Sequence, residues 1–340
     1  MFIINVVTYF FVKLYRVESR SLKRSETYYL VKDVRVGDTV SKVRVKLGYT
    51  RPDPEAEARL TTTPNSDLEV KALEKRLGTV RHIVKYLTPE EQRRVEETRY
   101  WIPLFHLFLS PSEYEQVEAL HEAEYIAGTT AIEGNTLTVQ QVDDLLHKGI
   151  SPVGKSLKEQ LEVKNAEKVA KYRMSYAGRV TLPFIKKLHG VMLNTINDQA
   201  GSFRRIDSIG ILGEDFAVTP AILIVSELEE AIKDYYAGVK AGRHPFEEAV
   251  KFHERFEMIH PFIDGNGRVG REVLRHMLAR AGYPDILIGR EDREKYINAL
   301  RDGHRGNAEQ MVKAFSELLL ADKREKLFRE ILSLRVVNKR

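Results

Sequence analysis

The sequence predicts a mainly α-helical protein that is preceded by a small, basic β unit. Apolar residues recur at helical spacing through most of the chain after residue 67, and several of these runs begin with a capping box. Ahead of them, β-branched and charged residues lie on both sides of Val36-Gly37-Asp38, a pattern that predicts a short hairpin. A chain of 340 residues can bury a large core and form two or three units.

Residues 1–51 form the basic β-rich unit. They carry eleven basic and four acidic side chains, so their net charge of +7 exceeds the +5 of the whole chain. Such a unit could contact nucleic acid or an acidic protein through residues 13–51. Lysine and arginine on exposed edge strands also prevent the addition of further strands, and this is the simpler interpretation.

The apolar start, residues 1–12, is too short to cross a bilayer before Lys13 and lacks a basic leader and a small-residue cleavage site. We expect a buried strand or a mistranslated leader there, rather than a signal peptide or a membrane segment. The absence of cysteine excludes disulfides and thiolate metal sites and is compatible with a reducing compartment. The composition therefore favours a cytoplasmic enzyme without a membrane anchor.

The remaining elements follow in order. Residues 52–66 are rich in Pro, Thr and charge and are predicted to be a linker, and a helical connecting segment covers 67–110, with a helix at 68–86 and a new start at 88–91. A capping box at 110–113 opens a long helix in the region 111–150. Residues 151–322 form the predicted core, with helix starts at 181–183, 226–229 and 244–247, and residues 323–340 form a C-terminal helix or tail.

One short run, His-Pro-Phe-Ile-Asp-Gly-Asn-Gly-Arg-Val-Gly-Arg at 260–271, contains most of the reactive groups that we identify. Its glycine turn, Gly265 to Gly267, is followed by apolar residues at helical spacing, so the turn is predicted to be a helix N-terminus. Free N–H groups and the positive end of the helix dipole then face the turn. This arrangement predicts a binding site for a polyphosphate.

The side chains around this turn suit phosphate chemistry. Arg268 and Arg271 lie three residues apart and can bind successive phosphates, and Asp264 is suited to Mg2+. His260 can be neutral near pH 7 and can accept a proton from an incoming hydroxyl. A helix stop followed by a plain turn would explain each dipeptide, but the complete pattern favours phosphoryl or nucleotidyl transfer.

The run resembles the signature of the Fic family: His, any residue, Phe, any residue, Asp or Glu, Gly-Asn-Gly-Arg, two residues, Arg. The resemblance implies a Fic-type helical bundle that transfers AMP from ATP to a Ser, Thr or Tyr hydroxyl of a target protein. It implies the following roles: His260 as general base, Phe262 as packing anchor, Asp264 as Mg2+ ligand, Gly265, Asn266 and Gly267 as anion cradle, and Arg268 and Arg271 on the outer phosphates. A kinase branch has Lys at the position of Gly267, so AMP transfer is favoured.

A second motif lies upstream, at the end of the helix in 111–150. Glu133 falls in the last helical turn, where the helix dipole disfavours an acid, so it needs a compensating partner. The pattern is similar to the inhibitory motif of Fic proteins and is matched by Thr129, Glu133 and Gly134. The resemblance implies that Glu133 binds Arg271, competes with the outermost phosphate and can also align a water for removing AMP. A solvated helix end is the alternative.

The resemblance extends over roughly 114–320 and includes Leu188-His189 and Gly201-Ser202-Phe203-Arg204. It implies a β-hairpin flap within 209–224 that pairs with the target segment, and it places Tyr296 and His304 near the adenine. His253, which is surrounded by apolar residues, is interpreted as a packing histidine. Release of the inhibitory helix by subunit exchange would make the protein a homo-oligomer.

The leading hypothesis is thus a Mg2+-dependent protein adenylyltransferase inhibited in cis by Glu133. One alternative is a Fic transferase that uses another nucleoside monophosphate donor. The other alternative is a nucleic-acid- or protein-binding adaptor, in which the basic unit binds and the Fic core is a nucleotide-responsive scaffold.

Overall fold

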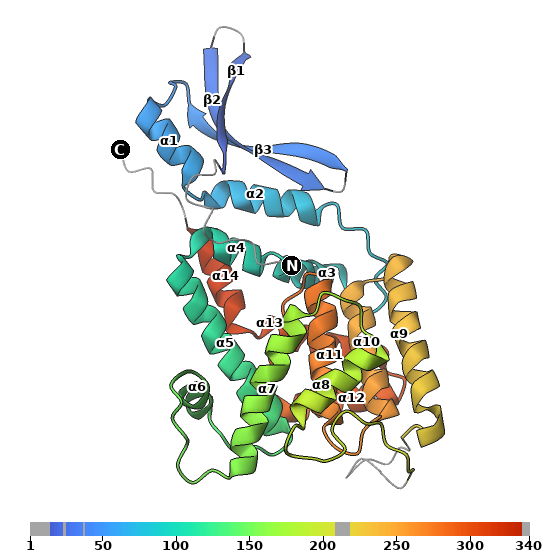
Figure 1. The fold of residues 1–340 in the computed structure, drawn as a ribbon. Helices are drawn as coiled ribbons and strands as arrows, with labels where there is room; N and C mark the ends of the chain where they lie inside the picture. The colour runs from blue at the N-terminus through green and yellow to red at the C-terminus, as the bar shows by residue number, and fades with distance from the viewer. Residues whose placement is uncertain (1–13, 23–24, 37, 208–217, 335–340) are drawn as a thin grey trace. The chain divides into compact units, whose positions relative to one another are not determined.

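The computed structural model describes residues 14–22, 25–36, 38–207 and 218–334. These residues form helices together with one small antiparallel sheet, as the sequence predicts (Figure 1). The chain divides into two compact units. The N-terminal unit takes its residues from 1–81, 96–114 and 323–340, and the core unit takes them from 82–95 and 115–322. None of the described helices is long and apolar enough to span a membrane.

The sheet of the N-terminal unit contains β1 (Arg16–Leu22), β2 (Ser25–Val36) and β3 (Thr39–Gly48) in the order β1-β2-β3 (Figure 1). The predicted hairpin is therefore present as β2 and β3, and Gly37 between them lies outside the described residues. Leu30 on β2 pairs with Val45 and is buried together with Tyr15 and Leu68. Val31, the next residue of β2, is also completely buried, so burial along this strand does not strictly alternate.

Several bases of this sheet are paired with acids of the same sheet. Arg16 contacts Asp33 at 2.7 Å, and Lys42 contacts Glu18 at 2.8 Å. These internal pairs reduce the charge that the unit can offer to an outside partner. Arg16 and Lys42 are therefore already paired within the sheet.

The helices α2 (Ser66–Leu77), α4 (Trp101–Phe108) and α14 (Lys323–Ser333) of the N-terminal unit form a second apolar cluster that contains Trp101, Phe105 and Phe328. The helix α1 (Pro54–Thr62) of this unit does not contribute to the cluster. The structure differs here from the predicted linker at 52–66, because Asp53 caps α1 by accepting a hydrogen bond from the Ala56 N–H. The helix expected at 68–86 also ends earlier, at Leu77, and residues 82–95 belong to the core unit.

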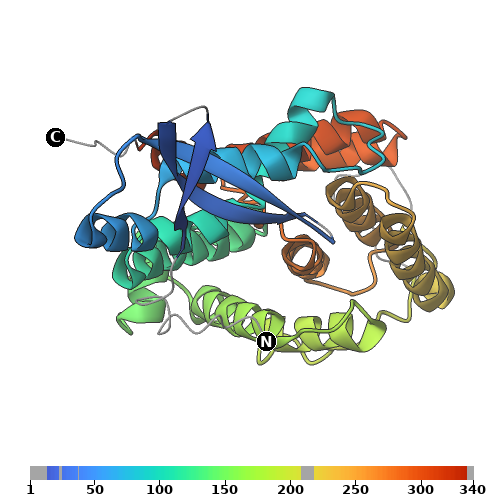
Figure 2. The same cartoon turned by 90° about the horizontal axis from the view of Figure 1, so that it is seen from above.

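The core unit is built around α11 (Asn266–Arg280), which is buried along almost its whole length (Figures 1 and 2). The surrounding helices are α6 (Val139–His147), α7 (Leu157–Ser175), α8 (Leu182–Met192), α9 (Ile224–Lys240), α10 (Pro245–Ile259), α12 (Arg293–His304) and α13 (Ala308–Leu320). Two further helices, α3 (Pro89–Thr98) and α5 (Pro111–Ile132), place most of their residues in this unit. A buried helix at the centre provides a fixed base for its N-terminal turn.

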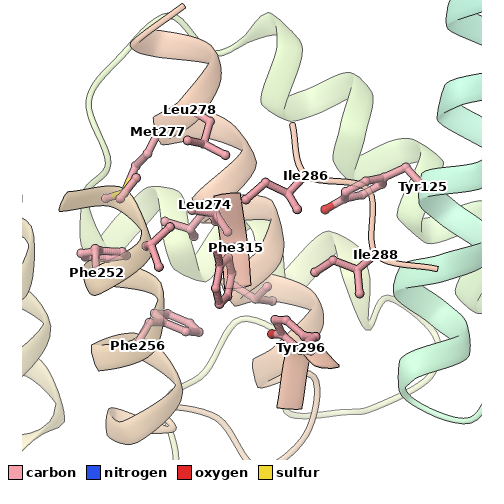
Figure 3. Close-up of a cluster of buried hydrophobic side chains, with 14 of the residues drawn as sticks. Tyr125, Phe252, Phe256, Leu274, Met277, Leu278, Ile286, Ile288, Tyr296 and Phe315 are labelled. Atoms are coloured by element: carbon pink, nitrogen blue, oxygen red, sulfur yellow. The ribbon is translucent and has the colours of Figure 1, made fainter. Parts of the chain in front are cut away.

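Aromatic and aliphatic side chains fix α11 against its neighbours. Phe252 and Phe256 of α10, Tyr296 of α12 and Phe315 of α13 meet Leu274 and Met277 of α11 in one buried cluster (Figure 3). All of these side chains are nearly inaccessible to solvent. The cluster therefore packs α10, α11, α12 and α13 against one another.

Gly128 allows α5 to approach the loop between α11 and α12. A Cβ atom at this position would overlap the backbone carbonyl of Ile288, which cannot move aside as a flexible side chain could.

Gly128→Ala is expected to lower the free energy of unfolding by about 1–3 kcal/mol, because the helix and the loop must separate. Chemical denaturation measures this change. Gly78→Ala is the matched control, since its Cβ meets its nearest neighbour at 3.4 Å and should have little effect; an equal loss in both variants would contradict the packing argument.

Candidate active site

His260 ends α10 in a left-handed backbone conformation, with φ 48° and ψ 60°. This region is sparsely populated by residues other than glycine and is held only when surrounding contacts impose it. The contacts come from Arg204, whose Nε donates to the His260 carbonyl at 2.8 Å and whose backbone N–H donates to the Pro261 carbonyl at 2.9 Å. The same guanidinium donates to the carbonyls of Ile259 and Thr219. Arg204 therefore fixes the turn that presents His260.

Replacing Arg204 tests this positioning role. The Arg204 side chain is completely buried, so Arg204→Ala leaves several carbonyls without a donor. We expect the free energy of unfolding to fall by about 3 kcal/mol, together with a loss of any reaction that depends on His260. Denaturation and activity measured side by side provide the readout. Arg205→Ala, at the adjacent exposed position, should change neither, and equal effects at the two positions would contradict this role.

The segment between His260 and α11 is fixed by two further side chains. Asn266 closes a ring with the backbone of Phe262, since its amide accepts from the N–H and donates to the carbonyl, both at 2.8 Å. The Phe262 ring stacks on His189 at 3.7 Å between centroids. His189 accepts from the Gly201 N–H at 2.7 Å and lies 3.0 Å from the Asp264 carbonyl. Burial lowers the pKa of His189, which favours the neutral ring that both contacts need.

Gly265 and Gly267 have separate steric roles at the start of α11. Gly265 has φ 79° and precedes the helix, a conformation that glycine adopts without strain. At Gly267 a Cβ atom would lie 2.5 Å from Glu133 Oε1 and 2.9 Å from Arg271 Nη1, so only glycine lets these groups approach the backbone. The first turn of α11 therefore exposes backbone N–H groups beside a guanidinium, as the sequence predicts.

Arg268 and Arg271 in the N-terminal half of α11 are both buried, but they bind different partners. Arg268 contacts Glu162 of α7 at 3.3 Å and Asp264 at 3.2 Å. The Asp264 side chain remains 45% exposed next to the helix N-terminus. No cluster of three or more potential metal-binding side chains occurs among the described residues, so a cation here would depend on Asp264 and on ligand oxygens. Such a site fits Mg2+, which needs only one or two protein carboxylates when phosphates and waters complete its shell.

Arg271 binds the end of α5. Its Nη2 donates to Glu133 Oε1 at 2.8 Å and to the Thr129 carbonyl at 2.9 Å, and its Nε donates to the Thr129 hydroxyl at 2.8 Å. Gly134 follows with φ 99° and ends the helix. The compensating partner expected for Glu133 is thus Arg271, and both motifs identified in the sequence meet at this guanidinium.

A cavity of about 440 Å³ opens beside these groups. It is lined by His260, by Gly267 and Arg271 of α11, by Glu133 and, on α12, by residues that include Tyr296 and His304. Burial lowers the pKa of His260, against the opposing effect of the Glu257 carbonyl. A lowered pKa leaves this imidazole neutral near pH 7, the form that accepts a proton.

Tyr296 lies in the cavity wall but is largely enclosed. Its hydroxyl lies 2.9 Å from His253 Nε2 and receives a long hydrogen bond of 3.5 Å from Arg271. Its exposed fraction is 1%, so little of its ring is available for stacking on a base. The packing role expected for His253 is confirmed, since this side chain is completely buried. Adenine contact by Tyr296 and His304 stays a prediction.

The predicted flap lies mostly outside the described residues, which omit 208–217. Where the structure resumes, Ala221–Leu223 forms a 3-10 helix and α9 begins at Ile224. The prediction of strand is therefore wrong for residues 221–224. Hydrogen bonds within this turn, such as that from the Leu223 N–H to the Pro220 carbonyl, replace the expected pairing.

The helical core and the glycine turn define a Fic fold. The described structure aligns with a Fic domain containing signaling protein from Bacteroides thetaiotaomicron at a TM-score of 0.62 and 24% identity, covering 72% of this chain and 99% of the other. It aligns with Fic-1 from C. elegans at 0.62 and 20% identity, covering 81% and 80%. At 24% and 20% sequence identity, these alignments show that the chain shares a fold with the two proteins and show nothing more.

Residues 179–278 match the model of the Fic/DOC family, so this part of the chain is similar to a Fic/DOC domain. Protein adenylyltransferase Fic of Drosophila willistoni is 30% identical over 199 residues, which are 57% of this chain and 39% of the relative. Protein adenylyltransferase Fic of Drosophila persimilis is 28% identical over 266 residues, which are 76% of this chain and 50% of the relative. The chain thus spans half or less of the length of these relatives.

Proposed function

We propose that this protein is a nucleotidyltransferase that moves AMP from ATP to a hydroxyl side chain of a target protein, with Mg2+ as cofactor. The observation that carries the proposal is the cavity in which neutral His260, the first turn of α11 and Arg271 meet. The names of the curated relatives, protein adenylyltransferase Fic, support the same activity.

The nucleotide would bind through its phosphates. The N–H groups of Asn266 and Gly267 would hold the phosphate at the helix N-terminus, while Arg268 and Arg271 would bind the outer phosphates. Phe262 and Asn266 keep this turn rigid through the contacts described above. Mg2+ held by Asp264 would neutralise phosphate charge.

His260 would then act as the general base. Its neutral imidazole takes the proton of the target hydroxyl, whose oxygen forms a bond to the α-phosphorus of ATP. The bond from that phosphorus to the bridging oxygen breaks, and pyrophosphate leaves while the arginines stabilise its charge. Burial of His260 supports this assignment, because a lowered pKa keeps the base unprotonated at neutral pH.

The contact between Glu133 and Arg271 would inhibit this reaction. Glu133 Oε1 accepts a hydrogen bond from the Arg271 guanidinium, which would otherwise bind the outermost phosphate. Thr129 accepts two further hydrogen bonds from the same guanidinium. A triphosphate must therefore displace the carboxylate before it binds productively. Inhibition acts within one chain, because α5 and α11 belong to the same core unit.

The transferred group can be identified by the intact mass of the Glu133→Gly protein after incubation with MgATP. We expect the mass to increase by one adenylyl group on the protein or on an added target. Addition of a phosphoryl group would instead indicate a kinase. Transfer from UTP, GTP or CDP-choline in place of ATP would indicate another donor.

A further inference from the structure

Glu257 lies on the last turn of α10 and lines the same cavity as His260 and Arg271. Only 7% of this residue is exposed, and its Oε1 atom is buried without a hydrogen-bond partner among the described residues. A Cβ atom at Gly270 would collide with this oxygen, so glycine on α11 makes the room that the carboxyl occupies. Glu257 is therefore a buried acid at the nucleotide cavity that the reaction proposed above does not use.

The groups that face Glu257 come from four helices. His253 of α10 places Nδ1 4.0 Å from Oε1, and burial lowers the pKa of this imidazole to about 3, so it is neutral. Tyr296 of α12 is neutral as well, because burial raises its pKa. The charged groups that act on Glu257 are Arg271 of α11 and Glu133 from the end of α5.

The Arg271 guanidinium thus acts electrostatically on two carboxyl groups, those of Glu133 and Glu257. Glu133 holds the hydrogen bond to Arg271, and Glu257 makes none. Burial, which has the largest effect, and the charge of Glu133 raise the pKa of Glu257 to about 8, while Arg271 acts in the opposite direction. With Glu133 in place, Glu257 is therefore mostly protonated at neutral pH.

We propose that Glu257 is a proton-carrying residue of the nucleotide cavity. Its carboxyl is neutral while the Glu133 carboxylate or a phosphate binds the Arg271 guanidinium, and it is ionised when neither of them binds there. In the ionised form it acts as the substitute counterion of Arg271. In the neutral form it leaves the guanidinium free for the ligand and avoids repelling the phosphates. This inference rests on the proposed nucleotide site and extends it with a coupling between nucleotide and proton.

The direction of the coupling follows from charge. Removing Glu133 removes a negative neighbour, so the pKa of Glu257 falls and a larger fraction of its carboxyl ionises. A bound triphosphate restores negative charge at Arg271 and raises the pKa again. The empty Glu133→Gly protein should therefore take up a proton when it binds nucleotide, and binding should weaken as the pH rises.

Isothermal titration calorimetry in buffers of different ionisation enthalpy measures this proton. Glu133→Gly is titrated with a non-hydrolysable MgATP analogue at pH 7.5, and the same titration is made with Glu133→Gly/Glu257→Gln, whose amide is neutral at every pH. We expect the first protein to take up a substantial fraction of one proton per nucleotide more than the second. The difference between the two cancels the protonation of the nucleotide itself.

Glu254→Gln in the Glu133→Gly background is the matched control. Glu254 is another acid of α10 with a pKa that burial raises, to about 7, but it does not line the nucleotide cavity. Its replacement should leave the proton uptake unchanged. Equal uptake with and without Glu257 overturns the proposal, whereas failure of every variant to bind the analogue overturns the nucleotide site itself.

A second measurement does not require the Gln variant to fold. In Glu133→Gly with 13C-labelled glutamate carboxyl carbons, one buried carboxyl should titrate at a lower pH in the empty protein and at a higher pH with the analogue bound. A titration midpoint that the nucleotide does not move overturns the proposal.

Discussion

His260→Ala is expected to lower the rate of AMP transfer by roughly 10²–10⁴-fold, the usual contribution of a positioned general base. The imidazole lines the cavity but takes no part in the contacts that hold the first turn of α11, so the phosphate site should survive its removal. The loss should therefore fall on kcat, with little change in the affinity for MgATP.

Initial rates and nucleotide affinity are compared in the Glu133→Gly background, where inhibition does not limit the signal. His147→Ala is the control, because this histidine lies on α6 with 44% of its side chain exposed. A His260→Ala protein that retains transfer within a few-fold of its parent would exclude the imidazole as base.

Glu133→Gly is expected to raise the apparent affinity for MgATP by about 10- to 100-fold, which corresponds to about 1.4–2.8 kcal/mol. The reason is that Arg271, 4% exposed, no longer holds a carboxylate at 2.8 Å that the outer phosphate must displace. The side chain of Glu133 is 28% exposed, so solvent screening keeps the effect below that of a fully buried pair.

Glu133→Gln separates charge from shape in this test. Its amide keeps the length of the side chain but loses the negative charge, so its affinity should lie between those of the parent and of Glu133→Gly. Calorimetric titration with a non-hydrolysable MgATP analogue gives all three values. Unchanged affinity in both variants would mean that the contact with Arg271 does not restrict the nucleotide.

The start of α11 at the candidate site is predictable from the sequence because its determinants are local. The glycine turn, the helix that follows and the position of His260 all lie within twelve residues, and each follows from spacing and turn chemistry. The partner of Glu133 could be named only through the resemblance, since 138 positions separate the two side chains. A helix-end acid indicates that a partner is needed but not which one.

Other features depend on contacts that no local pattern encodes. Arg204 matches a family motif, yet its role becomes visible only where it binds the carbonyls around His260. In the sequence, Glu257 has no feature that distinguishes it from other acidic residues of a helix. Only the structure shows that Arg271 of α11 and Glu133 at the end of α5 act on it. The sequence pattern does not predict the helix α1, because Asp53-Pro54 lies in a proline-rich stretch that is typical of a linker, although Asp before Pro is also a sequence signal for a helix start.

The central claim is that His260 acts as the general base of AMP transfer and that Glu133 inhibits this reaction, and it is tested most directly with ATP labelled at the α-phosphate. The original protein, Glu133→Gly and Glu133→Gly/His260→Ala are incubated with this label and Mg2+, and parallel samples receive ATP labelled at the γ-phosphate. The structure predicts protein-bound α-label that rises in Glu133→Gly and vanishes in the double variant, with no γ-label in any sample. Equal α-label in all three proteins, or label from the γ-phosphate, would contradict it.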